Sequence, residues 1–446
     1  MALKVGLISL GCAKNLIDSE TMIGILADGG YEITPEENEA DIIIVNTCAF
    51  IDSAKEEAIN TILDVAELKN NKLKALVVTG CLSQRYGEEV LKEFPEVDAI
   101  LGTNDYDKIL QAVEKVLSGE RFVSVSDKDD HITETYPRIS SMPSHVAYLK
   151  IADGCDNHCT YCIIPKLRGK YRSRPMDEII YEAKCLADNG VKEIILVAQD
   201  TAYYGFSDLG GYKLHILLKE LSKIEKIQWI RLQYCYPENI THELIEVIAT
   251  NPKVVHYLDM PLQHISDSVL KRMGRKSREK EIYALISELR ERIPDIVLRT
   301  SLITGFPGET NEDYIKMAEF LKIARIDRAG IFKYSREEGT GAYSFGDQID
   351  EETKEERYDT LMLIQQEVSR ENNLSLVGKR LKVIIEDYDF DELCYMARTY
   401  GDTPDVDMRA YVFSKDELNQ GDIVEMTVLQ STEYDLTGEV TDEFTK

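Results

Sequence analysis

Three cysteines lie within eight residues, in the stretch Cys155-Asp-Asn-His-Cys159-Thr-Tyr-Cys162. An odd number of thiols in one short loop does not suit disulfide pairing. Structural zinc usually takes four protein ligands, and no fourth Cys or His follows at finger spacing, although His158 is close by. A cuboidal iron–sulfur cluster suits the pattern better, because thiolates are its usual ligands and a tight loop can supply three of them. The fourth iron is then open to a small molecule. These three cysteines are called the loop trio.

A second group of cysteines comes from the first 81 residues: Cys12, Cys48 and Cys81, called the N-terminal trio. Each follows an apolar, strand-like run. The carboxyl ends of parallel strands share one sheet edge, where ligands bind, so we expect the three thiols to converge there. The alternative is three unrelated buried cysteines, since free Cys is commonly buried. The runs are Lys4–Leu10, Asp41–Val45 and Leu73–Val78.

The elements that position both trios follow from the alternation of strand-like and helical stretches. Residues 1–125 predict an N-terminal open parallel α/β sheet, and residues 126–144 a polar linker. Residues 145–370 hold six strand candidates with helices between most of them, which predicts a parallel (β/α)6 part-barrel. Residues 371–446 change to short strands of period two, which predicts a small antiparallel β-barrel. The fold class is therefore α/β with a terminal β-barrel.

Polar residues at the strand ends of the central part form a candidate pocket, because chemistry in such folds sits at the carboxyl ends of strands. Arg172 follows the loop trio and could bind a carboxylate in bidentate fashion. The alternative for Arg168, Arg172 and Arg174 is a solvated basic strip. Cys185 and Cys235 have no partner at ligand spacing and are expected to be packing residues. The strand-end residues are Gln199, Asp200, Gln263, Gly305 and Glu309.

The two trios and their surroundings resemble the methylthiotransferases, a subgroup of the radical S-adenosylmethionine (SAM) enzymes. The loop trio, with Tyr161 before its third cysteine, resembles the radical SAM signature. The stretches Ser-Leu-Gly-Cys-Ala-Lys-Asn, Asn-Thr-Cys-Ala-Phe and Thr-Gly-Cys-Leu resemble the N-terminal domain of the subgroup, and the tail resembles its TRAM domain. The resemblance implies two 4Fe-4S clusters, one held by each trio, and SAM as both radical source and methyl donor.

The same resemblance assigns the candidate pocket to SAM. Gln199 and Asp200 stand where the family holds the amino group or ribose of SAM. The segment from Gly305 to Glu309 is similar to the turn that lies along the adenosine. Tyr161, Gln263 and Arg172 complete the expected cofactor-binding residues, and no residue is assigned as a catalytic acid or base.

The charge of the chain bears on its partners. Asp and Glu number 80 against 52 Lys and Arg, a net charge of −28. From Val377 to Lys446 there are 17 acidic and 7 basic residues, a net −10. Such a tail repels phosphate backbones and favours a basic protein, so nucleic acid is not expected as the direct substrate. No apolar run is long enough to span a membrane and no signal peptide is evident, so we expect a cytoplasmic protein.

Within the family, the acidic tail favours the branch that modifies a small-subunit ribosomal protein. The implied reaction replaces a hydrogen on the β-carbon of an aspartate with a methylthio group, with electrons from a reductant protein such as flavodoxin or ferredoxin. A tRNA (adenosine) methylthiotransferase is the nearest alternative. A non-catalytic iron–sulfur electron-transfer protein and a zinc-stabilised binding module are alternatives from other classes.

Overall fold

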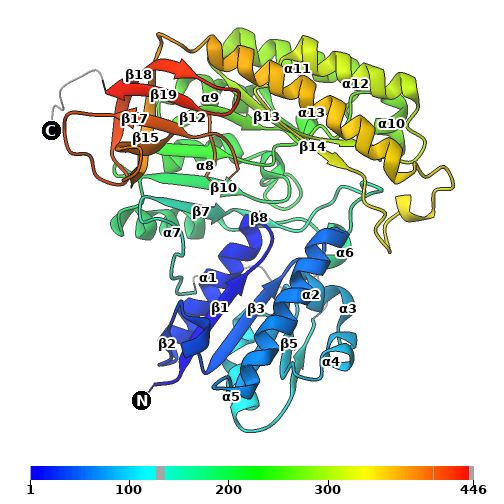
Figure 1. Ribbon diagram of the computed structural model, residues 1–446, viewed down its shortest axis with the longest axis vertical. Coiled ribbons are helices and arrows are strands. Elements are labelled where there is room, and N and C mark those ends of the chain that lie inside the picture. Colours follow the sequence, from blue (N-terminus) through cyan, green and yellow to red (C-terminus); the bar gives the residue numbers. More distant parts are fainter. Residues whose placement is uncertain (1, 127–135, 405, 441–446) are drawn as a thin grey trace.

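The fold was established from a computed structural model, which describes residues 2–126, 136–404 and 406–440. Figure 1 shows an N-terminal α/β layer below, a central α/β layer above it and a small β-barrel beside the central layer. Residues 127–135 of the predicted linker and 441–446 of the tail lie outside the described residues. No helix in the described part of the chain has both the length and the apolar character needed to cross a membrane.

The N-terminal layer is a six-stranded parallel sheet in the order β2-β1-β3-β4-β5-β6. Its central strands are buried along their whole length, as continuous β-branched and aliphatic runs are in sheets covered on both faces. Helices α2, α3 and α4 cover one face, and α1 and α5 cover the other. The elements are β1 (Lys4–Ser9), α1 (Ala13–Asp28), β2 (Glu32–Ile33), β3 (Ile42–Thr47), α2 (Asp52–Glu67), β4 (Ala75–Gly80), α3 (Cys81–Tyr86), α4 (Glu89–Glu93), β5 (Ala99–Leu101), α5 (Ile109–Leu117) and β6 (Phe122–Ser124).

The central layer is a second six-stranded parallel sheet, in the order β14-β13-β12-β11-β10-β7. Residues alternate along its strands between a face packed under helices and a face turned away from them; β13 shows this alternation in full. The elements are β7 (Val146–Lys150), β8 (Ala152–Asp153), α6 (Ile164–Arg168), β9 (Arg172–Ser173), α7 (Met176–Asp188), β10 (Glu193–Val197), α8 (Leu214–Leu221), β11 (Trp229–Leu232), α9 (His242–Thr250), β12 (Val254–Asp259), α10 (Asp267–Arg272), α11 (Glu279–Arg292), β13 (Val297–Thr304), α12 (Asn311–Ala324), β14 (Arg328–Lys333) and α13 (Glu351–Leu374).

The C-terminal strands form a closed barrel in the order β15-β16-β17-β19-β18. Four of its pairings are antiparallel, as predicted, but β17 and β19 pair in parallel, which closes the barrel. The strands are β15 (Arg380–Asp389), β16 (Cys394–Thr399), β17 (Ala410–Phe413), β18 (Ile423–Ser431) and β19 (Leu436–Val440).

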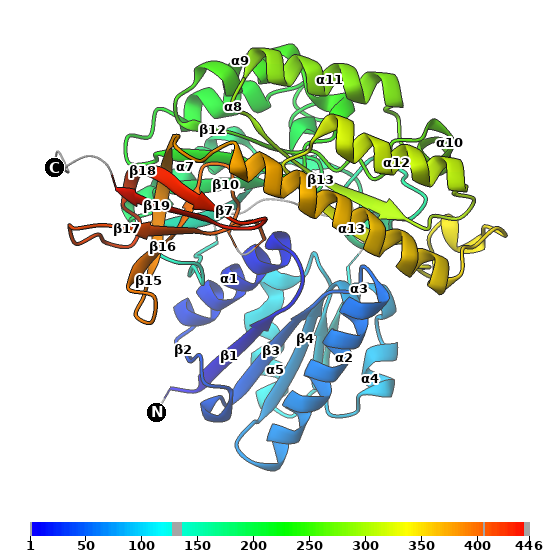
Figure 2. The same ribbon diagram turned by 45° about the horizontal axis from the view of Figure 1, so that its top comes forward.

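The barrel docks on the face of the central sheet that is not covered by helices. Ile384 of β15 packs with Trp229 and Tyr257 of the central strands. The fully buried Arg398 donates to Glu193 at 2.6 Å, so an ion pair fixes the barrel to the start of β10. Figure 2 shows the barrel beside β7, β10 and β12, with α13 running from the central layer toward it. The open side of the sheet is therefore partly closed by the barrel.

Candidate active site between the two cysteine groups

The N-terminal trio converges at the carboxyl edge of the first sheet. Cys12 is the residue before α1, Cys48 follows β3, and Cys81 begins α3 directly after β4. Since β1, β3 and β4 are neighbours in the sheet, their ends bring the three thiols together. Gly11 shows how tight this edge is: its φ is +92°, and a Cβ there would lie 2.8 Å from the Cβ of Cys48. The predicted convergence is confirmed.

The thiols of this trio influence one another electrostatically. Burial raises the pKa of Cys81 to about 12; Arg168 opposes the rise, and negative charge on Cys12 and Cys48 adds to it. For Cys12, burial also acts upward, but the cations Lys14 and Arg168 outweigh it and lower the pKa. A metal that binds the trio must displace the proton of Cys81, so thiol deprotonation is coupled to metal binding.

The loop trio lies between β8 and α6 in a loop that is tied down at both ends. Cys155 donates its backbone N–H to Gly169 O at 3.1 Å, and Thr160 donates its backbone N–H to Met273 O at 2.9 Å. Gly154 has a φ of +78°, and a Cβ there would lie 2.0 Å from the carbonyl oxygen of Lys170. The loop can close this tightly only with glycine at that position.

Both trios have the donors that an iron–sulfur cluster requires. Each supplies three thiols, and burial raises the pKa of Cys155 to about 12, so these are thiols that a metal must deprotonate. Among the described residues, no His, Cys, Asp and Glu group is close enough to surround a single ion. A cuboidal cluster holds its thiolates around a cage of four irons, so its ligands stand further apart than those of one ion.

The two trios lie on opposite sides of one interface. Helix α6, which follows the loop trio, packs on α3, which begins with Cys81. Ile163 and Leu167 belong to the same buried apolar cluster as Cys81. Thr103 of the first layer donates to Leu167 O at 2.8 Å. Figure 1 shows α6 beside α3 and α2 rather than among the central helices.

Arg168 joins the two sides through a buried ion-pair network. Its guanidinium donates to Asp153 at 2.8 Å, to Asp18 at 3.0 Å and to Asn15 Oδ1 at 2.6 Å. Lys150 completes the network through Asp18 at 2.5 Å. Arg168 is only 1% exposed. Arg168 therefore belongs neither to a solvated strip nor to a free carboxylate-binding group, so both readings offered by the sequence are wrong for this residue.

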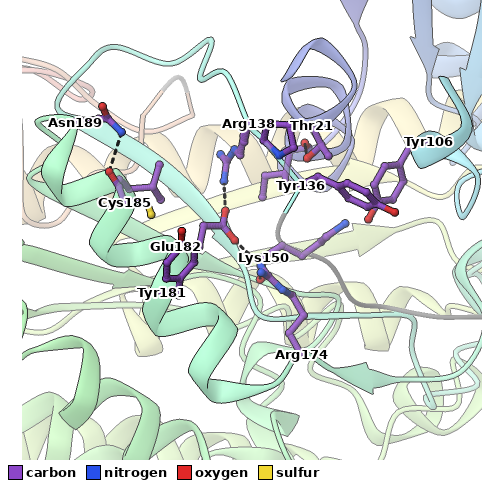
Figure 3. Close-up of a pocket in the computed structure, with 13 residues that line it drawn as sticks. Thr21, Tyr106, Tyr136, Arg138, Lys150, Arg174, Tyr181, Glu182, Cys185 and Asn189 are labelled. Atoms are coloured by element: carbon purple, nitrogen blue, oxygen red, sulfur yellow. Dashed lines mark hydrogen bonds and ion pairs between the residues drawn. The ribbon is translucent and has the colours of Figure 1, made fainter. Parts of the chain in front are cut away.

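The Arg174 side chain is also paired with a carboxylate. It lines a pocket of about 260 Å³ between α1 and α7. Figure 3 shows Glu182 between Arg138 and Arg174, and the ion pairs measure 2.8 and 2.7 Å. Cys185 lies at this pocket and is exposed, so its predicted packing role is wrong; Cys235 is buried in the core, as expected. The ion pairs at this pocket join the linker residue Arg138 to α7.

Gln199 and Asp200 follow β10 and face the loop trio. Gln199 donates to Asp153 at 2.8 Å, while its Oε1 is buried with no hydrogen-bond partner in the described chain. Asp200 accepts from Asn239 at 2.6 Å, and burial raises its pKa to about 7, with the Asn239 hydrogen bond opposing the rise. An unsatisfied buried oxygen and a buried acid of shifted pKa are typical of a ligand site.

The remaining strand-end residues differ in whether their side chains already have hydrogen-bond or ion-pair partners. Gln263 adopts a φ of +72°, and no hydrogen bond of its side chain is found among the described residues. Glu309 is fully engaged: it accepts from Gly305 N at 2.9 Å and pairs with Arg357 at 2.6 Å and with His264 at 3.4 Å. Glu309 therefore braces the turn that presents Gly305. His264 accepts from Ser266 N at its Nδ1 at 2.9 Å, while its buried Nε2 has no hydrogen-bond partner in the described chain.

Two predicted residues flank the loop trio itself. The Tyr161 ring packs with Phe306 and Tyr334, and burial raises the pKa of its hydroxyl well above the ordinary value. Arg172, in the short strand β9, donates to Arg168 O at 3.2 Å and is close enough to Asp153 to lower the pKa of that carboxyl. Both lie within the site, and their contact with a cofactor stays a prediction.

Sequence reasoning missed two residues that the fold adds to the site, Arg275 and Lys14. Arg275 stacks 4.1 Å from the ring centroid of Tyr236, with its Nη1 4.0 Å from Cys159 Sγ. Lys14 places its ammonium 3.5 Å from the ring centroid of Tyr234, at the end of β11. Only the position of Lys14 two residues after Cys12 hinted at its role. Asn15 donates its amide to the carbonyls of Leu10 and Thr47 and braces the loop beside Cys12.

Three family descriptions cover most of the chain. Uncharacterized protein family UPF0004 matches residues 4–102, the Radical SAM superfamily matches residues 149–321, and the TRAM domain matches residues 377–441. These ranges fall on the first sheet, the central layer and the terminal barrel respectively.

Curated relatives match over nearly the full length. The ribosomal protein uS12 methylthiotransferase RimO of Lachnoclostridium phytofermentans is 52% identical, over 98% of this chain and 99% of the relative. The protein of the same name from Clostridium perfringens is 50% identical, over 99% of each chain. Among solved structures, the radical S-adenosylmethionine methyltransferase TsrM from Kitasatospora setae aligns with a TM-score of 0.55 at 14% identity, over 74% of this chain and 73% of that chain, which shows a shared fold. The chain therefore belongs to the RimO family of radical SAM methylthiotransferases.

Proposed function

We propose that this enzyme adds a methylthio group to the β-carbon of an aspartate in ribosomal protein uS12. One observation carries the proposal: two groups of three thiols, each at the carboxyl end of parallel strands, border one interface and are joined through Arg168. A carbon–hydrogen bond at that position is not acidic enough for a protein base to break near neutral pH. The reaction therefore needs a radical source and a separate sulfur carrier close to each other.

The cofactors follow from the donor sets. Cys155, Cys159 and Cys162 would hold a 4Fe-4S cluster that, with SAM bound, supplies a radical able to take a hydrogen from an unactivated carbon. Cys12, Cys48 and Cys81 would hold a second 4Fe-4S cluster, with one iron left for the sulfur to be inserted. The tied loop and the glycines at Gly11 and Gly154 keep both groups in fixed positions.

The predicted SAM site lies around the loop trio. Gln199 has a free buried oxygen, Asp200 and Gln263 stand at neighbouring strand ends, and Tyr161 and Arg172 flank the loop. Gly305 and its brace Glu309 form the wall from β13. We propose that these seven residues surround SAM, with Glu309 acting by holding the Gly305 turn in place.

Charge supports a protein substrate over tRNA. The terminal barrel carries a net −10, and the whole chain −28. Each phosphate contact would require a cation on the enzyme, whereas a ribosomal protein that binds RNA is itself basic. We also propose a reductant protein such as flavodoxin or ferredoxin as the electron source, and the cytoplasm, where uS12 is made, as the place of action.

A direct assay decides between the two substrates. The enzyme is reconstituted anaerobically with iron and sulfide, then incubated with SAM, a reductant, and either uS12 or total tRNA. Mass spectrometry should find a methylthio group on one uS12 aspartate, and 5′-deoxyadenosine should form. The Cys155→Ala variant should give neither product. A methylthio group on tRNA but not on uS12 would overturn the proposed substrate, and no 5′-deoxyadenosine from the intact protein would favour an electron carrier instead.

A further inference from the structure

Lys14 is a buried lysine that forms no ion pair with a carboxylate in the described chain. Its side chain is 7% exposed, and no ion pair or hydrogen bond of its ammonium is found among the described residues. Buried lysines are almost always paired, because an isolated buried charge is costly. Lys150 and Lys354 of this chain obey that rule: Lys150 pairs with Asp18 at 2.5 Å and Lys354 with Glu351 at 2.7 Å. Lys14 has only the ring of Tyr234 beneath it.

The surroundings of Lys14 place it between the two trios. It lies in the first turn of α1, two residues after Cys12, and crosses the interface to Tyr234 at the end of β11. Tyr234 adopts a φ of +59°, and its backbone N–H is held by Asp259 at 3.1 Å, so the ring is fixed in this unusual position. The face of this fixed ring attracts the ammonium group and so restricts the position of the Lys14 side chain.

The acids near Lys14 are already neutralised by other cations. Cys12, Asp153 and Asp259 are all close enough to influence its charge, Cys12 most strongly. Asp153, however, pairs with Arg168 at 2.8 Å, and Asp259 pairs with Arg299 at 3.1 Å. Lys14 therefore has no carboxylate of its own, and its remaining anionic neighbour, Cys12, is assigned to the cluster, so a carboxylate that enters between the two layers can pair with Lys14.

We propose that Lys14 binds the side-chain carboxylate of the target aspartate. This inference rests on the proposed function. The β-carbon that would be modified is bonded directly to that carboxylate, so a cation that holds the carboxylate also fixes the reacting carbon between the trios. The same contact selects aspartate over asparagine, because an amide leaves the buried cation unpaired. Tyr234 is a positioning residue that holds the ammonium.

The test compares uS12 with a uS12 variant in which the target aspartate is asparagine. Affinity of the reconstituted enzyme for each protein is measured without SAM, by fluorescence anisotropy, and kcat/KM is measured with SAM. The wild-type enzyme should prefer the aspartate protein by roughly 10- to 100-fold, the range expected for a hydrogen bond to a charged group. Lys14→Met should lose most of that preference by weakening aspartate binding, while affinity for the asparagine protein stays nearly constant. Lys14→Arg should retain the preference in part.

Lys55→Met is the matched control, because Lys55 also projects from the first layer to the central one but pairs with Glu337 at 2.9 Å. It should keep the wild-type preference. Equal losses for both uS12 proteins in Lys14→Met would overturn the proposal by showing a structural role. A second outcome would also overturn the proposal: Lys14→Met loses iron, and Lys14→Arg keeps its iron but binds the aspartate and asparagine proteins equally well. If the wild-type enzyme modifies no uS12, the proposed function fails; if it modifies uS12 and Lys14→Met keeps the preference, only this inference fails.

Discussion

Replacing Arg168 by Met should destabilise the junction between the two trios more than any surface ion pair could. The change removes a buried guanidinium that donates to Asp153 and Asp18, whose side chains are 5% and 6% exposed. Both carboxylates are then left to share Lys150. Removing one partner of a buried ion pair typically costs about 3–5 kcal/mol, because the remaining charge stays buried without its counter-charge.

Arg370→Met provides the comparison. Arg370 and Glu367 form a similar arginine–carboxylate pair, but their side chains are 52% and 56% exposed. Exposed pairs contribute little, because solvent screens the charges and both side chains lose rotamer freedom. The two substitutions remove the same groups, so the difference between them isolates the effect of burial.

Urea unfolding of the metal-free proteins, followed by far-UV circular dichroism, measures both changes. Arg168→Met should lower the free energy of unfolding of the cooperative unit that contains the junction by about 3–5 kcal/mol. Iron retained by the N-terminal trio after reconstitution should fall with it, because Arg168 also holds Asn15 beside that trio. Equal urea midpoints for Arg168→Met and Arg370→Met would refute the reasoning that this network fixes the two layers.

Three further predictions concern other parts of the fold. The folded pKa of Asp200 is about 7, above its unfolded value of about 3.9, so the stability that its neutral form provides is complete below pH ~4 and is lost as the pH rises through 7. Asp200→Asn should therefore become increasingly stable relative to wild type between pH 5 and 8, by about 3 kcal/mol over that range, and a pH-independent difference in thermal unfolding would contradict this. Arg398→Met should leave Glu193 buried with Arg231 as its remaining partner and loosen the terminal barrel, which a red shift in the emission of the single tryptophan, Trp229, would report; an unchanged spectrum and unchanged protease resistance would contradict it. Gly154→Ala should prevent the loop trio from closing and remove about four irons, while full iron content would show that the loop adapts.

The sequence predicted the N-terminal trio because its geometry is a property of topology. Three cysteines that each follow a parallel strand must reach the same sheet edge, whatever the details of packing. The structure adds that β1, β3 and β4 are neighbours, which makes the convergence tight. The six-stranded central sheet was predictable for the same reason, since each strand and helix pair carried its own hydrophobic pattern.

The burial and ion-pair partners of the charged residues in the site could not be predicted from the sequence pattern. Arg168 looked like part of an exposed basic strip, but the carboxylate of Asp18, far away in the sequence, buries and pairs it. Glu309 looked like a ligand at a strand end, but Arg357 occupies it. The only local signal for Lys14 was its place two residues after Cys12, because its burial depends on Tyr234 from another layer. Partners of this kind are set by domain docking, which local patterns do not contain.

Small elements were missed for a related reason. The strands β2 and β6 have two and three residues, too short for a hydrophobic period to emerge. The parallel pairing of β17 with β19 arises only when the barrel closes. In each case the neighbouring strand, rather than the segment's own sequence, determines the structure.

The central claim is that two separate thiol trios each hold a four-iron cluster. Iron and acid-labile sulfide are counted after anaerobic reconstitution of the intact chain and of a variant with Cys12, Cys48 and Cys81 replaced by Ala. About eight irons are expected in the intact chain and about four in the variant, from four irons per cuboidal cluster. Zinc in place of iron, or the same iron content in both proteins, would contradict the account.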